Sequence, residues 1–418
     1  MDTISFGSGR EPKDWRDWWR RRLQRRMRAW LLVVATAAAV VAAILLVTSH
    51  GRAPRTPSLP MPPARPPPTM LVGVPARAVG TDLFLGGENL WRIDRQPRAI
   101  HSRLLHNGLS PLLPHGHGAE VDQLAPVSGG VVALISDIST GITYGARGRV
   151  LFIPAADAPA RVIGRATVIA VAPGGKQVWV QTAIQKLNHG AGAPAGFKSP
   201  TWSVNLTGRR VSPVLRLPLG LVGATESGPL TRTLATDRLR LWNGETGQPI
   251  HLPLPAAANF VAAGRDRVIW LGSASRLHVT DLRTGTDVVM PLPTRWLPPS
   301  GTYPPPAAVF DPPARHLVLL LDRVDAAGNT TAEDLFVADT ATGTLRMIPG
   351  KPLALPSAAM TLANPLTGSW DRQGLLWVLA ANPYTGRYQL GFWTGAGPLQ
   401  TFASAPGSPV TLSAPGSG

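Results

Sequence analysis

Beyond residue 70 the chain alternates between short apolar runs and turns, without a convincing amphipathic helix. The runs are rich in β-branched and aromatic residues and are interrupted by Gly, Pro, Asp and Asn, which is typical of an all-β chain. One phrase, an Asn or Asp followed by two residues and Thr-Gly, recurs at 243–247, 281–285 and 339–343. The Asx oxygen can accept amides of the bend, and glycine can take the positive φ that closes a hairpin. Each copy therefore predicts a turn between two strands.

Weaker copies of this turn continue the repeat along the rest of the chain. Together with the strong copies they give seven turns centred near 95, 157, 207, 246, 285, 342 and 395, a mean spacing of 50 residues. This spacing is typical of the blades of a β-propeller. We predict seven blades; six or eight stay open as alternatives, because the first and last copies are degenerate.

A second element, a dense apolar strand, lies upstream of most of these turns. Such strands occur at Val131–Ile135, Val178–Val180, Val268–Leu271, Leu317–Leu321 and Leu375–Leu379. Near-continuous hydrophobicity indicates burial on both faces, as between neighbouring blades. We predict four-stranded blades over residues 70–405 and a flexible tail over 406–418. Seven tryptophans on the predicted strands are expected to pack between blades: Trp91, Trp179, Trp202, Trp242, Trp270, Trp377 and Trp393.

On these turns and tryptophan-containing strands, the chain resembles the broad group of WD-repeat-like and YVTN-like β-propellers, over residues 70 to about 405. The resemblance is to the membrane-anchored versions, in which a basic cytoplasmic tail and a proline-rich spacer precede the propeller. It implies a fold, and it does not supply a function.

A charge-free run of 19 residues, Ala29 to Val47, precedes the repeats. At 1.5 Å per residue it reaches about 28 Å, close to the thickness of a bilayer core. We predict one transmembrane helix over 29–49; a cleaved signal peptide is the alternative, and the run is too long for it. Basic residues are denser before the span than after it, which predicts a cytoplasmic N-terminus and an extracytoplasmic C-terminal domain at the cell membrane.

The first 28 residues form a basic segment in which apolar side chains recur at helical spacing. Tryptophan suits the headgroup level of a bilayer and arginine can reach anionic lipid phosphates, so we predict a surface-lying helix that contacts anionic lipids at the cytoplasmic face. A flexible tail that only sets topology is the alternative. The expected membrane-interface residues are Trp15, Trp18, Trp19, Arg20, Arg21, Arg22, Arg25, Arg26 and Trp30.

Residues 50–69 separate the span from the repeats. Eight prolines fall between Arg52 and Thr69. Such a stretch favours extended polyproline II, so we expect a semi-rigid spacer that holds the propeller away from the membrane.

The net charge of +17 and the absence of cysteine narrow the possible chemistry. After residue 28 the basic residues are scattered rather than clustered, without the aromatic-basic interleaving of a strand-binding groove, so nucleic acid is not an expected partner. Without cysteine there can be no disulfide, zinc-thiolate site or thiol nucleophile.

Candidate site residues are few. His115 and His117, with Glu120 and Asp122 nearby, are a weak candidate metal site; the glycine- and proline-rich segment favours an exposed loop instead. Trp296 and Tyr303 lie in a proline-rich connection and are candidate contacts for a ligand or partner, with packing over the blade ends as the alternative. No nucleophile elbow or P-loop occurs, and we expect no catalytic residue and no cofactor.

The sequence therefore predicts a membrane-tethered extracytoplasmic propeller that binds a protein or an envelope polymer. Two alternatives stay open. The chain could be a transmembrane sensor or regulator that signals through the arginine-rich stub, or a propeller enzyme of hydrolase, lactonase or oxidoreductase type with its site at the central channel.

Overall fold

The computed structural model describes the chain from residue 69 onward, with gaps. The described ranges are 69–70, 82–87, 89–96, 99–106, 119–137, 148–156, 158–182, 198–218, 220–232, 238–255, 258–272, 276–298, 308–311, 314–326, 330–350, 368–381, 388–405 and 411–416. The predicted span and the arginine-rich stub lie outside these ranges. Within them, no helix is long and apolar enough to cross a membrane.

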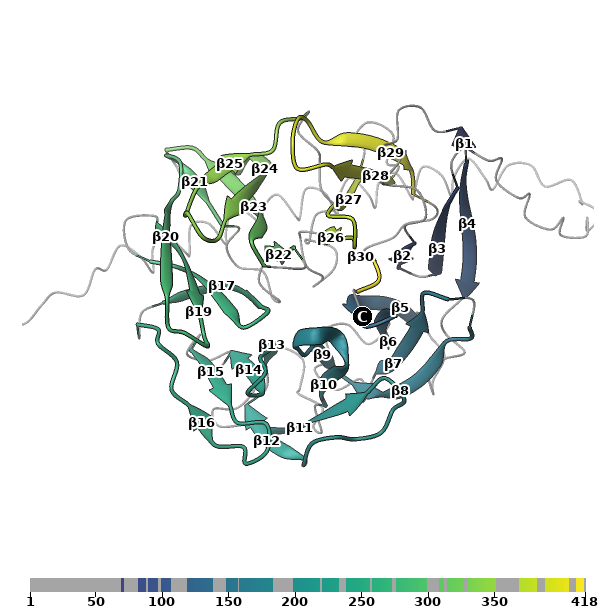
Figure 1. Ribbon diagram of the computed structural model, residues 1–418, viewed down its shortest axis with the longest axis vertical. Helices are drawn as coiled ribbons and strands as arrows, with labels where there is room; N and C mark the ends of the chain where they lie inside the picture. The colour runs from purple at the N-terminus through teal and green to yellow at the C-terminus, as the bar shows by residue number, and fades with distance from the viewer. Residues whose placement is uncertain are drawn as a thin grey trace, which may run out of the picture. The chain divides into compact units, whose positions relative to one another are not determined.

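The described residues form an all-β propeller of seven sheets, the blades, arranged around an axis (Figure 1). Five of the sheets have four antiparallel strands each, as the repeat predicted, and the sheets of blades 1 and 6 each have a fifth, short strand. The innermost strands contact one another in the order β30, β5, β9, β13, β17, β22, β26 and back to β30, so the ring is closed.

The strands follow the chain from blade to blade. Blade 1 contains β2 (Leu83–Gly86), β3 (Leu90–Gln96) and β4 (Ala99–His106), with the short β1 (Thr69–Met70) outside β4. Blade 2 contains β5 (Ala119–Val127), β6 (Gly130–Asp137), β7 (Gly148–Pro154) and β8 (Arg161–Ala166). Blade 3 contains β9 (Val168–Val171), a 3-10 turn η4 (Pro173–Gly175), β10 (Gln177–Gln181), β11 (Lys198–Asn205) and β12 (Leu215–Pro218).

The remaining blades repeat this pattern. Blade 4 contains β13 (Leu221–Ala224), β14 (Pro229–Arg232), β15 (Leu239–Trp242) and β16 (Pro249–Ile250). Blade 5 contains β17 (Asn259–Gly264), β18 (Arg267–Leu271), β19 (Arg276–Asp281) and β20 (Asp287–Pro291). In blade 6, β21 (Trp296–Leu297) and β22 (Ala308–Phe310) both pair with β23 (His316–Val324), followed by β24 (Thr330–Asp339) and β25 (Leu345–Met347). Blade 7 contains β26 (Gly368–Trp370), β27 (Leu376–Ala381), β28 (Tyr388–Trp393) and β29 (Gln400–Ser404).

The C-terminal strand β30 (Thr411–Ser413) corrects the prediction of a flexible tail over 406–418. It pairs with β2 and is the innermost strand of blade 1, so strands from the two ends of the described chain share one blade. Leu412 and Ala414 are buried against blade 7, and Gly416 bridges Ser128 of blade 2. The segment is ordered because its apolar side chains fill the gap between the first and the last blade.

The core consists of seven apolar clusters, one between each pair of neighbouring blades. The five dense apolar strands predicted from the sequence fall in the second strands of blades 2, 3, 5, 6 and 7, which are covered on both faces. The prediction that tryptophans pack between blades is confirmed at Trp179, Trp242, Trp270, Trp377 and Trp393, which are buried in these clusters.

Six of the seven predicted turns fall between the third and fourth strands of a blade, and the first, near residue 95, falls on the last residues of β3. The predicted turn chemistry is confirmed in the strong copies. Oδ1 of Asp281 accepts the amides of Arg283 and Thr284 at 2.9 and 3.0 Å, and Gly285 takes a φ of 74°. Asp339 and Asn243 accept the corresponding amides of their own turns.

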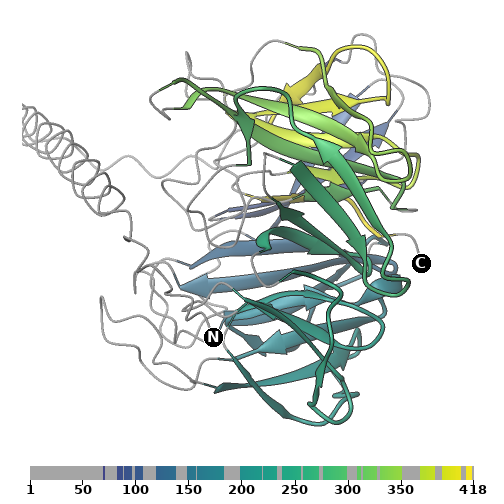
Figure 2. The ribbon, with the colours of Figure 1, turned by 90° about the vertical axis from the view of Figure 1, so that its left-hand side faces the viewer.

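The first and third turns of an antiparallel blade lie at the same end of the blade. These turns therefore share one side of the ring, here called the hairpin face; Figure 2 shows the blades from the side.

The Asp339 turn gives a pH-dependent prediction. Hydrogen bonds from the amides of Thr342 and Ala341 hold the pKa of Asp339 below its ordinary value. The stability that this carboxylate adds is therefore present above the unfolded-state pKa of about 4 and is lost as the pH falls through the lower folded-state pKa. We expect Asp339→Ala to lower the free energy of unfolding by about 0.5–1.5 kcal/mol at pH 7 and by less below pH ~3.

Urea titrations at both pH values would measure this effect, with Asp339→Asn as the control. Asparagine keeps an acceptor oxygen for both amides, so its loss at pH 7 should be smaller. A loss for Asp339→Ala that is the same at both pH values would contradict the assignment of the stability to the charged carboxylate.

Candidate functional site

A network of hydrogen bonds and charge contacts, made by side chains and backbone groups, joins turns of blades 4, 5 and 6 on the hairpin face. It consists of residues from the turns between the first and second strands and from the edge of blade 6, here called the 4–5–6 cluster: Glu226, Arg265, Asp266, Arg267, Asp311, Arg315, His316 and Thr340. The three members with guanidinium or imidazole groups that are exposed are Arg265, Arg315 and His316. We take this cluster as the candidate site.

The two-residue turn between β17 and β18 carries backbone strain. Arg265 and Asp266 have φ values of 50° and 59°. A turn with positive φ at both positions favours Asn-Gly, and each larger residue there costs free energy. The turn is held because Asp266 Oδ1 accepts the amide of Glu226 at 2.9 Å and its carbonyl accepts the amide of Leu282 at 2.7 Å. Strain of this kind collects at functional sites.

Arg267 connects blade 5 to blade 6 beneath this turn. Its Nη1 donates to the carbonyl of Ala314 and, at 2.7 Å, to Oγ1 of Thr340. The Thr340 hydroxyl lies within hydrogen-bond distance of the carbonyls of Ala314 and Arg315, at 2.8 and 3.1 Å. The blade 6 turn is therefore fixed by contacts from two blades.

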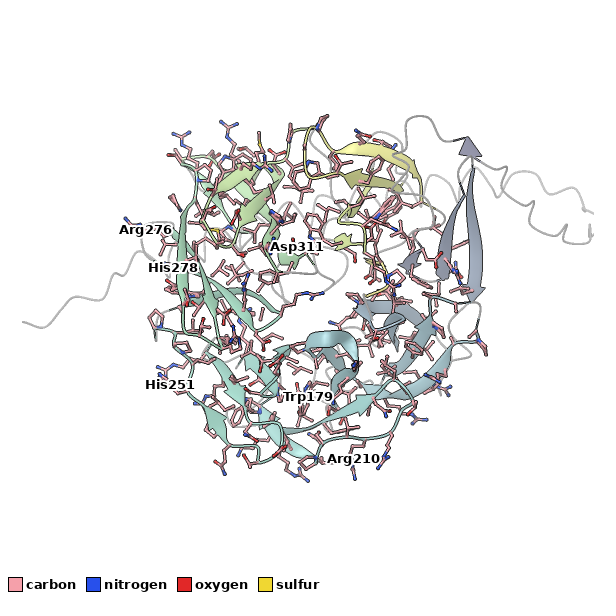
Figure 3. The ribbon with its side chains drawn as sticks, viewed as in Figure 1. Trp179, Arg210, His251, Arg276, His278 and Asp311 are labelled. Atoms are coloured by element: carbon pink, nitrogen blue, oxygen red, sulfur yellow. The ribbon has the colours of Figure 1, made fainter. Side chains whose placement is uncertain are left out.

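Asp311 and His316 are joined by two hydrogen-bond contacts within the cluster. Oδ1 of Asp311 accepts the amide of His316 at 2.9 Å, and its Oδ2 lies 2.8 Å from His316 Nδ1. The carboxylate is buried, whereas the imidazole is 47% exposed. Figure 3 places Asp311 on the inner side of blade 6. Since a carboxylate accepts the Nδ1 proton, the neutral ring has Nε2 as its remaining acceptor, and the protonated ring has Nε2–H as a donor.

Burial changes the pKa values of the turn residues. It lowers the pKa of Arg265, and the nearby charge of Asp311 opposes that change. It raises the pKa of Asp266, and the hydrogen bond from the amide of Glu226 opposes that change. The exposed Arg265, Arg315 and His316 can present guanidinium and imidazole groups to an anionic group. Arginine matches the geometry of both carboxylate and phosphate.

A second His-Asp pair, at the outer side of blade 5, has a structural role. The His278 ring stacks on Trp270 with centroids 3.8 Å apart, and its Nδ1 lies 2.7 Å from Asp287 Oδ2. The other oxygen of Asp287 accepts the Thr280 hydroxyl, which in turn accepts the indole N–H of Trp270. These four side chains satisfy one another within the blade, and Figure 3 shows His278 at the periphery of the ring.

The strained turn gives a prediction for stability. We expect Arg265→Asn to raise the free energy of unfolding by about 0.5–1 kcal/mol, because asparagine takes a positive φ at lower cost. Arg276→Asn is the matched control: Arg276 is an exposed β19 residue, where asparagine is unfavourable, so stability should not rise. Chemical denaturation would compare them. A destabilised Arg265→Asn variant would show that contacts of Arg265 outweigh the strain.

Of the site residues predicted from the sequence, the structure describes Trp296. His115, His117 and Tyr303 lie outside the described residues. Trp296 is on β21, half-buried, with its ring edge-on to Phe336 at 5.0 Å, and it packs on the core between blades 5 and 6. Packing therefore accounts for Trp296, and its role as a ligand contact stays a prediction. The predicted membrane-interface residues also lie outside the described part of the chain.

The metal candidate is described only at its acidic end. The Ser136 hydroxyl bonds to Oδ2 of Asp122, and burial raises the pKa of this carboxyl. Within the described ranges, no group of three or more His, Cys, Asp or Glu residues is placed to hold a metal ion.

Sequence reasoning missed the 4–5–6 cluster. Its members come from turns that are 40 or more residues apart in the chain, such as Glu226, Asp266 and Asp311. One local signal was available: an Arg-Asp pair between two apolar runs at 265–266, where a tight hairpin favours Asn-Gly.

Comparisons with known proteins concern the fold alone. No family model matches the sequence, and no curated protein matches it. Among solved structures, apo AztD from Citrobacter koseri is 15% identical, with 80% of this chain and 97% of that chain covered at a TM-score of 0.43. A putative 6-phosphogluconolactonase from Bacteroides uniformis is 11% identical, with 79% and 98% covered at 0.45. The β-propeller domain of the Trilobed protease from Pyrococcus furiosus is 11% identical, with 68% and 86% covered at 0.43.

Proposed function

We propose that the chain is a single-pass membrane protein whose propeller lies outside the cytoplasm and binds a protein or an envelope polymer through its hairpin face. The 4–5–6 cluster carries the binding part of this proposal. It combines a strained turn, exposed cationic side chains and a network of hydrogen bonds that fixes the turns of three blades. Side chains held by packing and hydrogen bonds before a ligand arrives lose less entropy on binding.

The membrane part of the proposal rests on the sequence. The apolar run at 29–47 is long enough to span a bilayer, and basic residues are denser on its N-terminal side. In this arrangement Trp15, Trp18 and Trp19 lie at the cytoplasmic lipid headgroups, beside arginines that contact anionic lipids. The proline-rich residues 50–69 then act as a spacer of up to about 60 Å between bilayer and propeller.

In the proposed site, an anionic group of the ligand lies between Arg265, Arg315 and His316. The buried Asp311 carboxylate orients the imidazole, so Nε2–H can donate to the anion when the ring is protonated. Arg267 does not need to touch the ligand, because its guanidinium is committed to blade 6. Its part is to hold the site together.

Photo-crosslinking in intact cells tests the binding face. The full chain would carry Arg315→p-benzoylphenylalanine, and the control would carry Thr401→p-benzoylphenylalanine on the outer strand β29, which is also exposed. We expect a discrete crosslinked species for position 315 that is reduced by Arg265→Ala. Equal crosslinking at both positions, or none at 315, would contradict the proposed face.

A further inference from the structure

The ring is electrically polarised between two of its sides. Residues 158–225, which hold the outer strand of blade 2 and nearly all of blade 3, contain eight Lys and Arg and no Asp or Glu. Residues 308–350 of blade 6 contain six acidic and three basic residues. The overall charge of the chain does not account for this difference. Positive charge is concentrated in one part of the ring, and negative charge is concentrated in another.

The structure gathers five of these arginines on the outer rim of blades 2 and 3. They lie on the edge strands β8 and β12 and on the turn between β11 and β12: Arg161, Arg165, Arg209, Arg210 and Arg216, here called the basic rim. All five are exposed. Figure 3 shows Arg210 at the periphery of the ring, pointing away from it.

Arg161 joins the two blades into one surface. Its Nε donates to the carbonyl of Leu206 in the blade 3 turn at 2.9 Å, and its guanidinium lies 4.9 Å from the centre of the Phe152 ring. This contact ties the outer strand of blade 2 to the blade 3 turn that carries Arg209 and Arg210. Within the described ranges, the side chains of the other four have no hydrogen bond or ion pair, so their charges face solvent.

Exposed apolar side chains accompany these charges. Val162, Val211 and Val214 are 51, 44 and 47% exposed, and they are three of the five large hydrophobic side chains most exposed in the described part of the chain. Like charges placed together without partners repel one another and lower stability. A surface that combines this cost with exposed valines has the composition of a contact surface.

We infer that the basic rim binds a linear polyanion, a flexible polymer with phosphate or carboxylate groups along its length. Arg161 and Arg165 are four residues apart on β8, about 13 Å along the strand, so one extended chain can meet several guanidinium groups in succession. Each arginine can form paired hydrogen bonds with a phosphate or carboxylate. This surface is separate from the hairpin-face site and does not depend on it.

A bilayer and a nucleic acid fit the rim less well. Docking on lipid uses exposed Trp, Tyr or Phe anchors, and stacking of nucleic acid bases uses exposed aromatic faces. On the described rim, Phe152 is buried and Trp202 is half-buried against the core between blades 2 and 3. Arginine on an edge strand can also serve to prevent that edge from pairing with another sheet. Protection of an edge does not explain why a whole blade lacks acidic residues.

The test compares two triple variants of the full chain, purified in a neutral detergent. The rim variant is Arg209→Gln/Arg210→Gln/Arg216→Gln. The control, Arg238→Gln/Arg240→Gln/Arg276→Gln, removes the same charge from exposed positions of blades 4 and 5. Binding of inorganic polyphosphate, polygalacturonate and phosphatidylglycerol vesicles would be measured by sedimentation or fluorescence anisotropy at several salt concentrations.

We expect the wild type to bind polyphosphate or polygalacturonate, and the polymer that binds more tightly identifies phosphate or carboxylate as the preferred group. The rim variant should bind at least about 10-fold more weakly with a shallower salt dependence, and the control should change by less than about 2-fold. Because repulsion is relieved, the rim variant should melt at the same temperature or higher.

Three results would overturn the inference: no polymer binding by the wild type, equal weakening of both triple variants, or rim-dependent binding of vesicles only. The last would assign the rim to a lipid surface. The rim variant should leave the crosslinked species at position 315 unchanged, because none of its three arginines belongs to the hairpin-face site, and this separates the inference from the proposed function.

Discussion

Replacing Leu412 with aspartate is expected to lower the free energy of unfolding by about 3–5 kcal/mol, one of the two largest effects that the structure predicts. Leu412 lies on β30 and is 3% exposed, packed with side chains of blades 7 and 1. A carboxylate at this position would be buried without a partner. The strand pairs with β2 through three residues, and the apolar contact of Leu412 with blade 7 is part of what holds the ring closed.

Thr401→Asp is the matched control for this change. It introduces the same carboxylate on β29, the outer strand of blade 7, where the side chain is exposed. Its effect should stay within about 0.5 kcal/mol. Guanidinium unfolding of both variants, followed by tryptophan fluorescence, measures the difference. Similar stability for the two variants would show that the C-terminal strand does not close the ring.

Trp377→Ala is the other large effect, with an expected loss of about 3–5 kcal/mol. Trp377 is fully buried in the apolar cluster between blades 7 and 1, which also contains Leu412. Its indole N–H donates to Asp371 Oδ2 at 2.9 Å, while Asp371 Oδ1 accepts the amides of Gln373 and Leu375. The substitution therefore opens a cavity and removes a donor from a buried carboxylate.

Trp377→Phe separates these two effects. It keeps most of the ring volume and removes only the donor, so a loss of about 1–3 kcal/mol is expected, smaller than that of alanine. Calorimetry of the three proteins gives the order wild type, Phe, Ala in decreasing stability. A loss below about 1 kcal/mol for alanine would contradict the burial of Trp377.

Repeated local signals made the fold predictable. Asp281 and Asp339 stabilise turns through amides two and three residues away, so this chemistry is visible in the sequence itself. The dense apolar strands were found because burial on both faces leaves a continuous hydrophobic run. Seven turns at a mean spacing of 50 residues then predicted the blade number.

The C-terminal strand was missed because it has no such local signal. Thr411–Ser413 are three residues among glycine, proline and serine, and their partners on β2 lie more than 300 residues earlier in the chain. Strand formation at such a site is decided by the neighbouring blades rather than by intrinsic preference.

The candidate site was missed for a related reason. Asp311 with His316 is visible in the sequence only as two polar residues five positions apart, and nothing there places them beside Arg265. The ring closure that brings turns of blades 4, 5 and 6 to one side creates the site. The expectation that basic residues after residue 28 are scattered is corrected by the basic rim, because the position of five arginines on two edge strands and one turn required the structure.

Cysteine labelling in intact cells tests most directly the central proposal that the propeller lies outside the cytoplasm and the N-terminus lies in the cytoplasm. The chain contains no cysteine, so single introduced thiols report without background. Ser8→Cys lies before the apolar run, and Glu245→Cys lies on an exposed turn of blade 4. With a membrane-impermeant maleimide, we predict labelling at position 245 in intact cells and at position 8 only after permeabilisation. Labelling at position 8 together with protection at position 245 would contradict the account.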